Sequence, residues 1–148
     1  MTRRQTLPER WFIVTGSQTL SDIRERTGHY GLLLLPDVPT GVRTEVKRLS
    51  RRRALPLIEE KAGASFRVHD MRELRRALGR RSPIILISPI NATRTHPDWQ
   101  PMPRMRAATL ARLTNRTAIA LGGMNARRYA KIAPLGFIGW AGISGFRT

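Results

Sequence analysis

Cysteine is missing from this sequence, and so is any long apolar run. Without cysteine the chain can form neither disulfide bonds nor thiolate metal sites, which fits a reducing cytoplasm. No apolar stretch reaches the roughly 18 residues that a membrane-spanning helix needs. Pro8, Glu9 and Arg10 interrupt the segment that would form the apolar core of a secretory signal. We therefore expect a cytoplasmic protein that does not enter a membrane.

Acidic residues are scarce beside basic ones: 10 Asp and Glu stand against 27 Lys and Arg, a formal net charge of +17. Such a charge attracts polyanions, so nucleic acid is one class of partner to consider. The basic residues are nevertheless spread over nearly every segment, and aromatic side chains that could stack on bases do not lie among the densest run, 51–53. We interpret the charge as a solvated arginine-rich surface, with a charge-driven nucleic-acid binder as the disfavoured alternative.

Short apolar runs alternate with helical patterns along the 148 residues, a length that suits one domain over 1–148. The runs are continuously apolar, which is typical of parallel strands buried on both faces. Strand–helix alternation predicts an α/β fold, and seven runs are one short of a closed (βα) barrel. We therefore expect a compressed or incomplete parallel barrel of the TIM type. The predicted strands are 11–15, 32–35, 55–58, 65–68, 83–87, 117–121 and 137–143.

The connection between the third and fourth runs, from Ile58 to Ser65, is too short to hold a helix. Seven strands do not easily close an eight-stranded barrel, and an open barrel exposes strand edges. We therefore expect either a closed seven-stranded barrel or a gap that a loop or a second subunit covers. A homo-oligomer is accordingly one expected state of assembly.

Helical patterns between the runs predict which faces of the helices meet the core. Asp70 and Glu73 form a capping-box-like pair at one helix start, and Asn125 is placed to cap another. The expected core stripes are Met71, Leu74 and Leu78; Val42, Val46 and Leu49; Met105, Ala108 and Leu113; and Tyr129 with Ile132.

The loop after 83–87 is the first candidate for binding a ligand, because βα proteins bind ligands at the carboxyl ends of their strands. Its hydroxyl, guanidinium and imidazole groups are of the kinds that bind an anionic oxygen. The alternative interpretation is an ordinary polar turn. The candidate residues are Thr93, Arg94, Thr95 and His96.

Glycines at the end of 117–121 form the second candidate. Gly122 and Gly123 allow backbone N–H groups to approach a ligand closely, and the helix that follows presents an N-terminus that favours anions. Ser144 and Gly145 follow the last run, whose end lies beside that of 117–121 in a barrel. We expect these four residues to bind one phosphate, whereas the alternative for the glycines is a tight strand-to-helix turn.

The sequence shows few motifs that would indicate a metal site or a catalytic nucleophile. The histidines His29, His69 and His96 are far apart and show no metal-ligand spacing, and there is no nucleophile elbow or Walker-type phosphate loop. Glu59 and Glu60 are adjacent carboxylates at a strand end and are candidates for holding Mg²⁺, with a solvated turn as the alternative. The sequence shows no partner for His69, which we interpret as a structural polar residue rather than a base.

Three spaced segments in the second half resemble one known family. The stretch 88–96, Ser-Pro-Ile-Asn-Ala-Thr-Arg-Thr-His, resembles the Gly-Pro-Val-Phe-x-Thr-x-Thr-Lys loop after the sixth strand of thiamine phosphate synthases. The stretch 118–124, Ala-Ile-Ala-Leu-Gly-Gly-Met, is similar to the family's seventh strand, Val-x-Ala-Ile-Gly-Gly-Ile, and 139–146 to its eighth. The stretches 10–16 and 65–73 resemble its first and fifth strands. The resemblance is good over 64–148 and thin before it.

The resemblance implies a (βα)8 barrel that joins a pyrimidine diphosphate to a thiazole phosphate and releases pyrophosphate with the help of Mg²⁺. It implies a dissociative reaction, in which the thiazole nitrogen attacks a pyrimidine cation while the protein stabilises the departing charge. By resemblance, the pyrophosphate loop consists of Thr93, Arg94, Thr95 and His96. The thiazole phosphate site consists of Gly122, Gly123, Ser144 and Gly145, with Ser144 on the family's serine.

This sequence also departs from the family pattern. His96 replaces a lysine with a weaker, pH-dependent cation. The stretch 35–37, Leu-Pro-Asp, stands where Arg-x-Lys should end the second strand, and Glu59-Glu60 stands where Asn-Asp should end the third. The fourth strand, with its Mg²⁺ aspartate, and the helix before it have no counterpart.

We therefore expect a shortened, divergent thiamine phosphate synthase-like transferase that keeps the phosphate half of the site. A first alternative is a catalytically inactive barrel that binds a phosphate metabolite. A second is the family branch that isomerises the thiazole without Mg²⁺, for which His69 would be the base.

Overall fold

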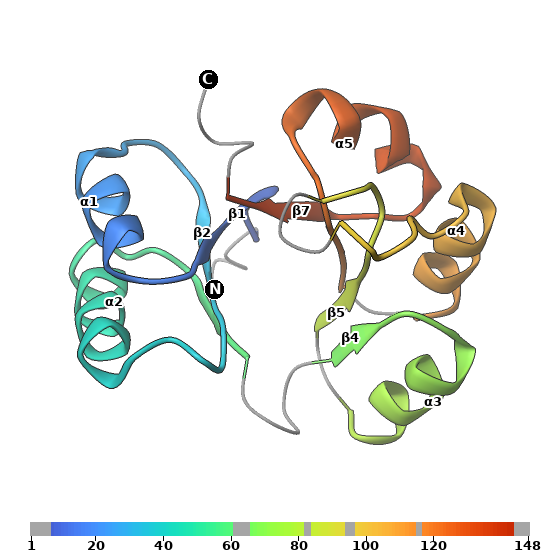
Figure 1. Ribbon diagram of the computed structural model, residues 1–148, viewed down its shortest axis with the longest axis horizontal. Coiled ribbons are helices and arrows are strands. Elements are labelled where there is room, and N and C mark those ends of the chain that lie inside the picture. Colours follow the sequence, from blue (N-terminus) through green and yellow to red (C-terminus); the bar gives the residue numbers. More distant parts are fainter. Residues whose placement is uncertain (1–6, 61–65, 82–83, 94–96, 115–116, 144–148) are drawn as a thin grey trace, which may run out of the picture.

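Each apolar run of the sequence forms a strand of one parallel sheet in the computed structural model, which describes residues 7–60, 66–81, 84–93, 97–114 and 117–143 (Figure 1). The strands within these ranges are β1 Arg10–Val14, β2 Gly31–Leu34, β3 Leu57–Glu59, β4 Phe66–Val68, β5 Ile84–Ile87, β6 Thr117–Leu121 and β7 Gly139–Gly142. The helices are α1 Ser17–Glu25, α2 Thr40–Arg52, α3 Met71–Gly79, α4 Arg104–Leu113 and α5 Ala126–Ile132, followed by a 3-10 turn, η1, Ala133–Leu135. None of these helices is long and apolar enough to cross a membrane.

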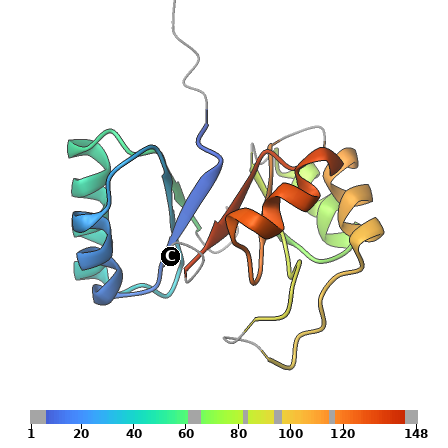
Figure 2. The ribbon, with the colours of Figure 1, turned by 90° about the horizontal axis from the view of Figure 1, so that it is seen from above.

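The sheet curls into an open half-barrel. Its strand order is β3-β2-β1-β7-β6-β5-β4, and all neighbouring pairs are parallel. The helices α1 and α2 lie on one side of the molecule and α3, α4 and α5 on the other (Figure 2). The expectation of an incomplete TIM-type barrel is thus confirmed.

The two edges of the sheet are β3 and β4, and they do not pair within the described residues. The alternative of a closed seven-stranded barrel is therefore wrong for this part of the chain. The opening falls between β3 and β4. Residues 61–65, which connect the two edges, lie outside the described residues.

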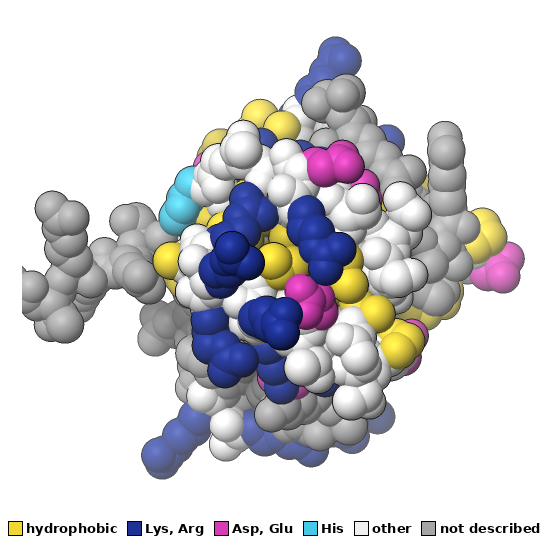
Figure 3. Space-filling view, turned by 90° about the vertical axis from the view of Figure 1, so that its left-hand side faces the viewer, with side chains coloured by type: hydrophobic (Ala, Val, Ile, Leu, Met, Phe, Trp, Pro, Cys, Tyr) yellow, Lys and Arg dark blue, Asp and Glu magenta, His cyan; other side chains and the backbone are white. Residues whose placement is uncertain are grey.

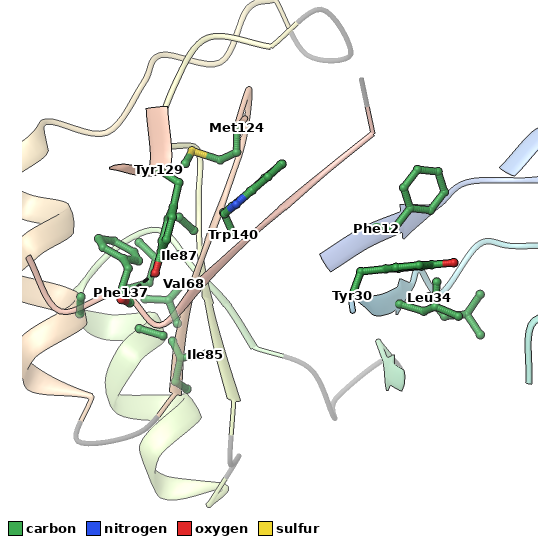
Figure 4. Close-up of a cluster of buried hydrophobic side chains, with 14 of the residues drawn as sticks. Phe12, Tyr30, Leu34, Val68, Ile85, Ile87, Met124, Tyr129, Phe137 and Trp140 are labelled. Carbon is green, nitrogen blue, oxygen red and sulfur yellow. Dashed lines mark hydrogen bonds between the residues drawn. The ribbon is translucent and has the colours of Figure 1, made fainter. Parts of the chain in front are cut away.

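Two apolar layers explain why the runs are continuously apolar. The outer layer joins strand residues such as Val14, Leu34 and Ile87 to helix residues, and Figure 4 shows part of it. Among the described residues, the inner layer contains strand residues and the positions next to them but no helix residue, so its side chains fill the interior of the curled sheet. Its buried members are Trp11, Ile13, Leu33, Leu86, Ile119, Leu121 and Ala141. Both faces of the sheet are buried, as the sequence predicts.

Both predicted helix caps are confirmed. The Asp70 carboxylate accepts a hydrogen bond from the Glu73 N–H at 2.8 Å, and this bond lowers the pKa of the Asp70 carboxyl group. The Asn125 Oδ1 atom accepts one from the Arg128 N–H at 2.8 Å. The core stripes of α2 and α5 are confirmed as well, because Val46, Leu49, Tyr129 and Ile132 are buried and Val42 packs against the core.

Two of the predicted stripes are wrong in part. Met105 and Leu113 in α4 are 75% and 50% exposed, and Met71 at the start of α3 is 40% exposed. The buried face of α4 is made mostly of small residues: Ala107, Ala108, Leu110 and Ala111. Alanine is only weakly hydrophobic, so an alanine-rich buried face is hard to recognise in the sequence. The larger Met105 and Leu113 therefore led to a prediction of the wrong buried face. Met71 is the first residue of its helix, and Leu74 and Ala77 take the buried positions instead.

Candidate functional site

The carboxyl ends of the strands meet at one rim of the half-barrel, because all seven strands described are parallel. Since β6 lies between β5 and β7 in the sheet, the loops that follow these three strands leave neighbouring positions on the rim. The loop after β4 starts beside the loop after β5. The candidate residues predicted from the second half of the sequence therefore belong to adjacent loops.

The loop after β5 is docked on the glycines that follow β6. The Ile90 N–H donates to the Leu121 carbonyl at 3.0 Å, and the Asn91 N–H donates to the Gly122 carbonyl at 3.1 Å. A Cβ atom on Gly123 would lie 2.5 Å from the Ala92 carbonyl oxygen. Gly122 and Gly123 also have φ angles of +105° and +56°, which side chains disfavour. Gly122 and Gly123 therefore form a tight strand-to-helix turn that also holds the adjacent loop, while their binding of a phosphate stays a prediction.

Arg128 is a cation at this turn that the sequence analysis missed. Its guanidinium donates to the Gly123 carbonyl, while its N–H is bonded to the Asn125 cap. The side chain thus folds back from α5 over the turn that precedes the helix. Its position three residues after a capping Asn is the sequence signal that could have identified it.

Most of the predicted anion-binding side chains lie outside the described residues. Thr93 is described and half-buried, whereas Arg94, Thr95 and His96 are not described. Ser144 and Gly145 also lie beyond the described part, directly after Ile143. The structure shows only the described residues that precede them: Thr93 before Arg94, and Ile143, just after β7, before Ser144.

The two adjacent glutamates point to opposite faces of the sheet and do not share a metal site. The Glu59 carboxylate is paired with Arg43 at 2.9 Å and Lys47 at 3.2 Å, both on α2. Glu60 is buried, with 7% of the residue exposed, and its carboxylate accepts two hydrogen bonds from Arg67 in β4, at 2.9 and 3.0 Å. Neither the Mg²⁺ pair nor the solvated turn fits this geometry. Among the described residues, no group of three or more His, Asp or Glu is placed to hold a metal.

His69 has partners that the sequence did not reveal. Its Nδ1 atom lies 2.7 Å from the Ser88 carbonyl oxygen, and its ring meets Trp99 edge-on with centroids 6.1 Å apart. Its backbone N–H donates to the Glu73 carboxylate at 2.9 Å. His69 therefore tethers the loops after β4 and β5, in line with the structural role predicted for it.

Part of the excess positive charge serves the fold. Basic side chains gather on the side of the molecule that carries α1 and α2 (Figure 3). On this side Arg24 and Arg48 pair with Glu45 at 3.3 and 3.5 Å. The Arg53 guanidinium donates to the Ile23 and Arg26 carbonyls, at the carboxyl end of α1. These contacts give some of the basic side chains partners within the fold, while the solvated arginine-rich surface stays a prediction.

These features define a class of protein by its fold: an open (βα) half-barrel in which the loops after neighbouring parallel strands lie side by side on one rim. Among solved structures, thiamine phosphate pyrophosphorylase from Pyrococcus furiosus shares this fold, with a TM-score of 0.73 over 92% of this chain and 85% of that chain. The two sequences are 14% identical, so the likeness establishes the fold and no more. No family model matches the chain, and no curated protein matches it in sequence.

Proposed function

We propose that this chain binds a phosphorylated thiazole at the rim formed by the loops after β5, β6 and β7, as a thiamine phosphate synthase-like protein of thiamine biosynthesis. The observation that carries the proposal is the docking of the loop after β5 on Gly122 and Gly123. It brings two of the three family-like segments into backbone contact, at 3.0 and 3.1 Å, on a fold that a thiamine phosphate pyrophosphorylase shares.

The proposed activity is the coupling of this thiazole phosphate to a pyrimidine diphosphate. The carbon–oxygen bond to the leaving pyrophosphate breaks, and the thiazole nitrogen then forms a bond to the resulting pyrimidine cation. The chain's part is to hold the departing charge with hydroxyl, guanidinium and imidazole groups. The residues proposed for that role are Thr93, Arg94, Thr95 and His96. The thiazole phosphate is proposed to lie on Gly122, Gly123, Ser144 and Gly145.

A non-catalytic role is the second candidate, and the ion pairs of the glutamates favour it. Glu59 and Glu60 are held by Arg43, Lys47 and Arg67, so neither is available to a metal without losing its partner. A barrel of this kind would bind a phosphate metabolite without turning it over. Release of pyrophosphate in the presence of both substrates would exclude this candidate.

The first test is thermal unfolding at fixed salt with thiazole phosphate, with inorganic phosphate as the control. Ligand at about 100 times its Kd stabilises a protein by roughly 2.7 kcal/mol. For a chain of this size, that corresponds to about 5–10 °C in Tm. We expect thiazole phosphate to raise Tm by this amount and added DNA to leave the shift unchanged. A shift no larger than that of inorganic phosphate would contradict the proposal, and competition by DNA at low salt would favour the charge-driven alternative.

Gly123→Ala tests whether the docked loop matters for binding. The new Cβ would lie 2.5 Å from the Ala92 carbonyl oxygen at a φ of +56°, so the loop after β5 must move. We expect a loss of about 1–3 kcal/mol in stability and loss of the Tm shift with thiazole phosphate. The matched control is Gly16→Ala, after β1, where a Cβ meets nothing within 4 Å. If the folded Gly123→Ala protein shows the same Tm shift with thiazole phosphate as the unaltered protein, these glycines are not part of the binding site.

A further inference from the structure

A cavity of about 240 Å³ lies on the helix side of the sheet, between α4, α5 and the segment that precedes α4. Six of its lining residues are apolar, among them Met102, Ile132 and Phe137, which are all buried members of the outer layer. The cavity therefore suits a small ligand with an apolar body.

The polar side chains around this cavity are one-sided in charge. Arg104, Arg128 and Lys131 line it together with Asn91, and none of its lining residues in the described part of the chain carries a carboxylate. Arg104 reaches from α4 to the Lys131 carbonyl, which brings its guanidinium next to the last turn of α5. A guanidinium carries five N–H donors, so this one bond leaves Arg104 able to bind an anionic oxygen as well.

We propose that this cavity is a second binding site, which takes a small apolar group bearing one phosphate or carboxylate. The apolar body occupies the floor formed by Met102, Ile132 and Phe137, and the anion lies between Arg104 and Lys131. Sites of this kind combine a mostly apolar lining with a few polar groups that fix the orientation of the ligand. The apolar floor and the two cations that carry the proposal belong to α4, α5 and the chain beside them, whereas Asn91 and Arg128 border both this cavity and the turn of the proposed thiazole phosphate site.

Phenyl phosphate is the probe, and isothermal titration calorimetry is the measurement. Its ring matches the apolar floor of the cavity, and its phosphate matches the cations Arg104 and Lys131. We therefore expect it to bind at least about tenfold more tightly than either phenol or inorganic phosphate. Lys131→Glu replaces one cation and presents a carboxylate to Arg104, while the backbone carbonyl that Arg104 contacts is retained. This variant should weaken phenyl phosphate by about tenfold or more.

Arg127→Glu is the matched control, because Arg127 is exposed on the same helix and does not line the cavity. It changes the net charge by the same amount and should leave phenyl phosphate affinity within a factor of about two. Equal losses in both variants would mean attraction to the overall charge and would overturn the proposal. Thiazole phosphate at saturation should leave the probe bound, and displacement of the probe would place it at the strand rim instead. The comparison of Lys131→Glu with Arg127→Glu tests the cavity independently of the proposed function, because it does not require thiazole phosphate to bind.

Discussion

Glu60→Ala is expected to destabilise the protein by about 3 kcal/mol, because it leaves the Arg67 guanidinium without its partner. Glu60 follows β3 and Arg67 lies in β4, so this two-bond pair joins the two edges of the open sheet. Arg67 is the register partner of Leu86, an inner-layer residue, and its side chain therefore faces the interior. Its side chain is 29% exposed, which is why we take the lower end of the range for a buried pair.

Urea unfolding gives the measurement, with Cm compared at constant m-value. The expected loss corresponds to roughly 6–12 °C in Tm. The reference is Arg24→Ala, which removes an exposed pair with Glu45 at 3.3 Å and should cost less than about 1 kcal/mol. If Glu60→Ala lowers the free energy of unfolding no more than Arg24→Ala does, the Glu60–Arg67 pair does not stabilise the two open edges of the sheet.

A double substitution separates the charge from the packing. Glu60→Leu together with Arg67→Leu removes both charges and leaves apolar side chains facing the inner layer. Replacement of a buried ion pair by apolar residues is often neutral, whereas removal of one partner is not. We therefore expect the double variant to be clearly more stable than Glu60→Ala. A double variant as unstable as the single one would mean that the two hydrogen bonds, rather than the isolated charge, carry the stability.

This ion pair also shows where the sequence stops predicting the structure. Glu59 and Glu60 stand out in the sequence as adjacent carboxylates at a strand end, and that placement is correct. Alternation along a strand turns them to opposite faces, one toward α2 and the other toward the interior. Arg67, the cation that pairs with Glu60, lies seven positions later in the next strand, and no local sequence pattern links the two residues. Pairing across the gap is a tertiary property.

The fold itself was largely predictable, for a physical reason. A run that is apolar at every position must be buried on both faces, and such runs, alternating with helical patterns, specify a parallel sheet covered by helices. Their number indicated that the barrel is incomplete. Prediction failed for the helix face of α4, where alanines form the contact, and for Arg128, although its position three residues after the capping Asn125 is a local signal.

Gly31→Ala is the second substitution with a large expected effect. Gly31 and Trp11 are register partners in β2 and β1, and the buried indole of Trp11 lies directly over the glycine. A Cβ on Gly31 would lie 2.2 Å from Trp11 Cε3 and 2.4 Å from Cζ3. Because the inner layer is closely packed, the indole has little room to move. We expect a loss of about 3 kcal/mol, the upper end of the usual cost of overpacking a core.

Gly41→Ala is the control for the change of residue type. Gly41 lies in α2, a Cβ there meets nothing within 4 Å, and alanine is favoured in a helix, so stability should rise by up to about 1 kcal/mol. The cause is tested by adding Trp11→Leu to Gly31→Ala. The smaller side chain removes the clash, so the double variant should lose less stability than the sum of the single variants. Simple additivity in urea unfolding would show that Gly31 is needed for a reason other than the indole.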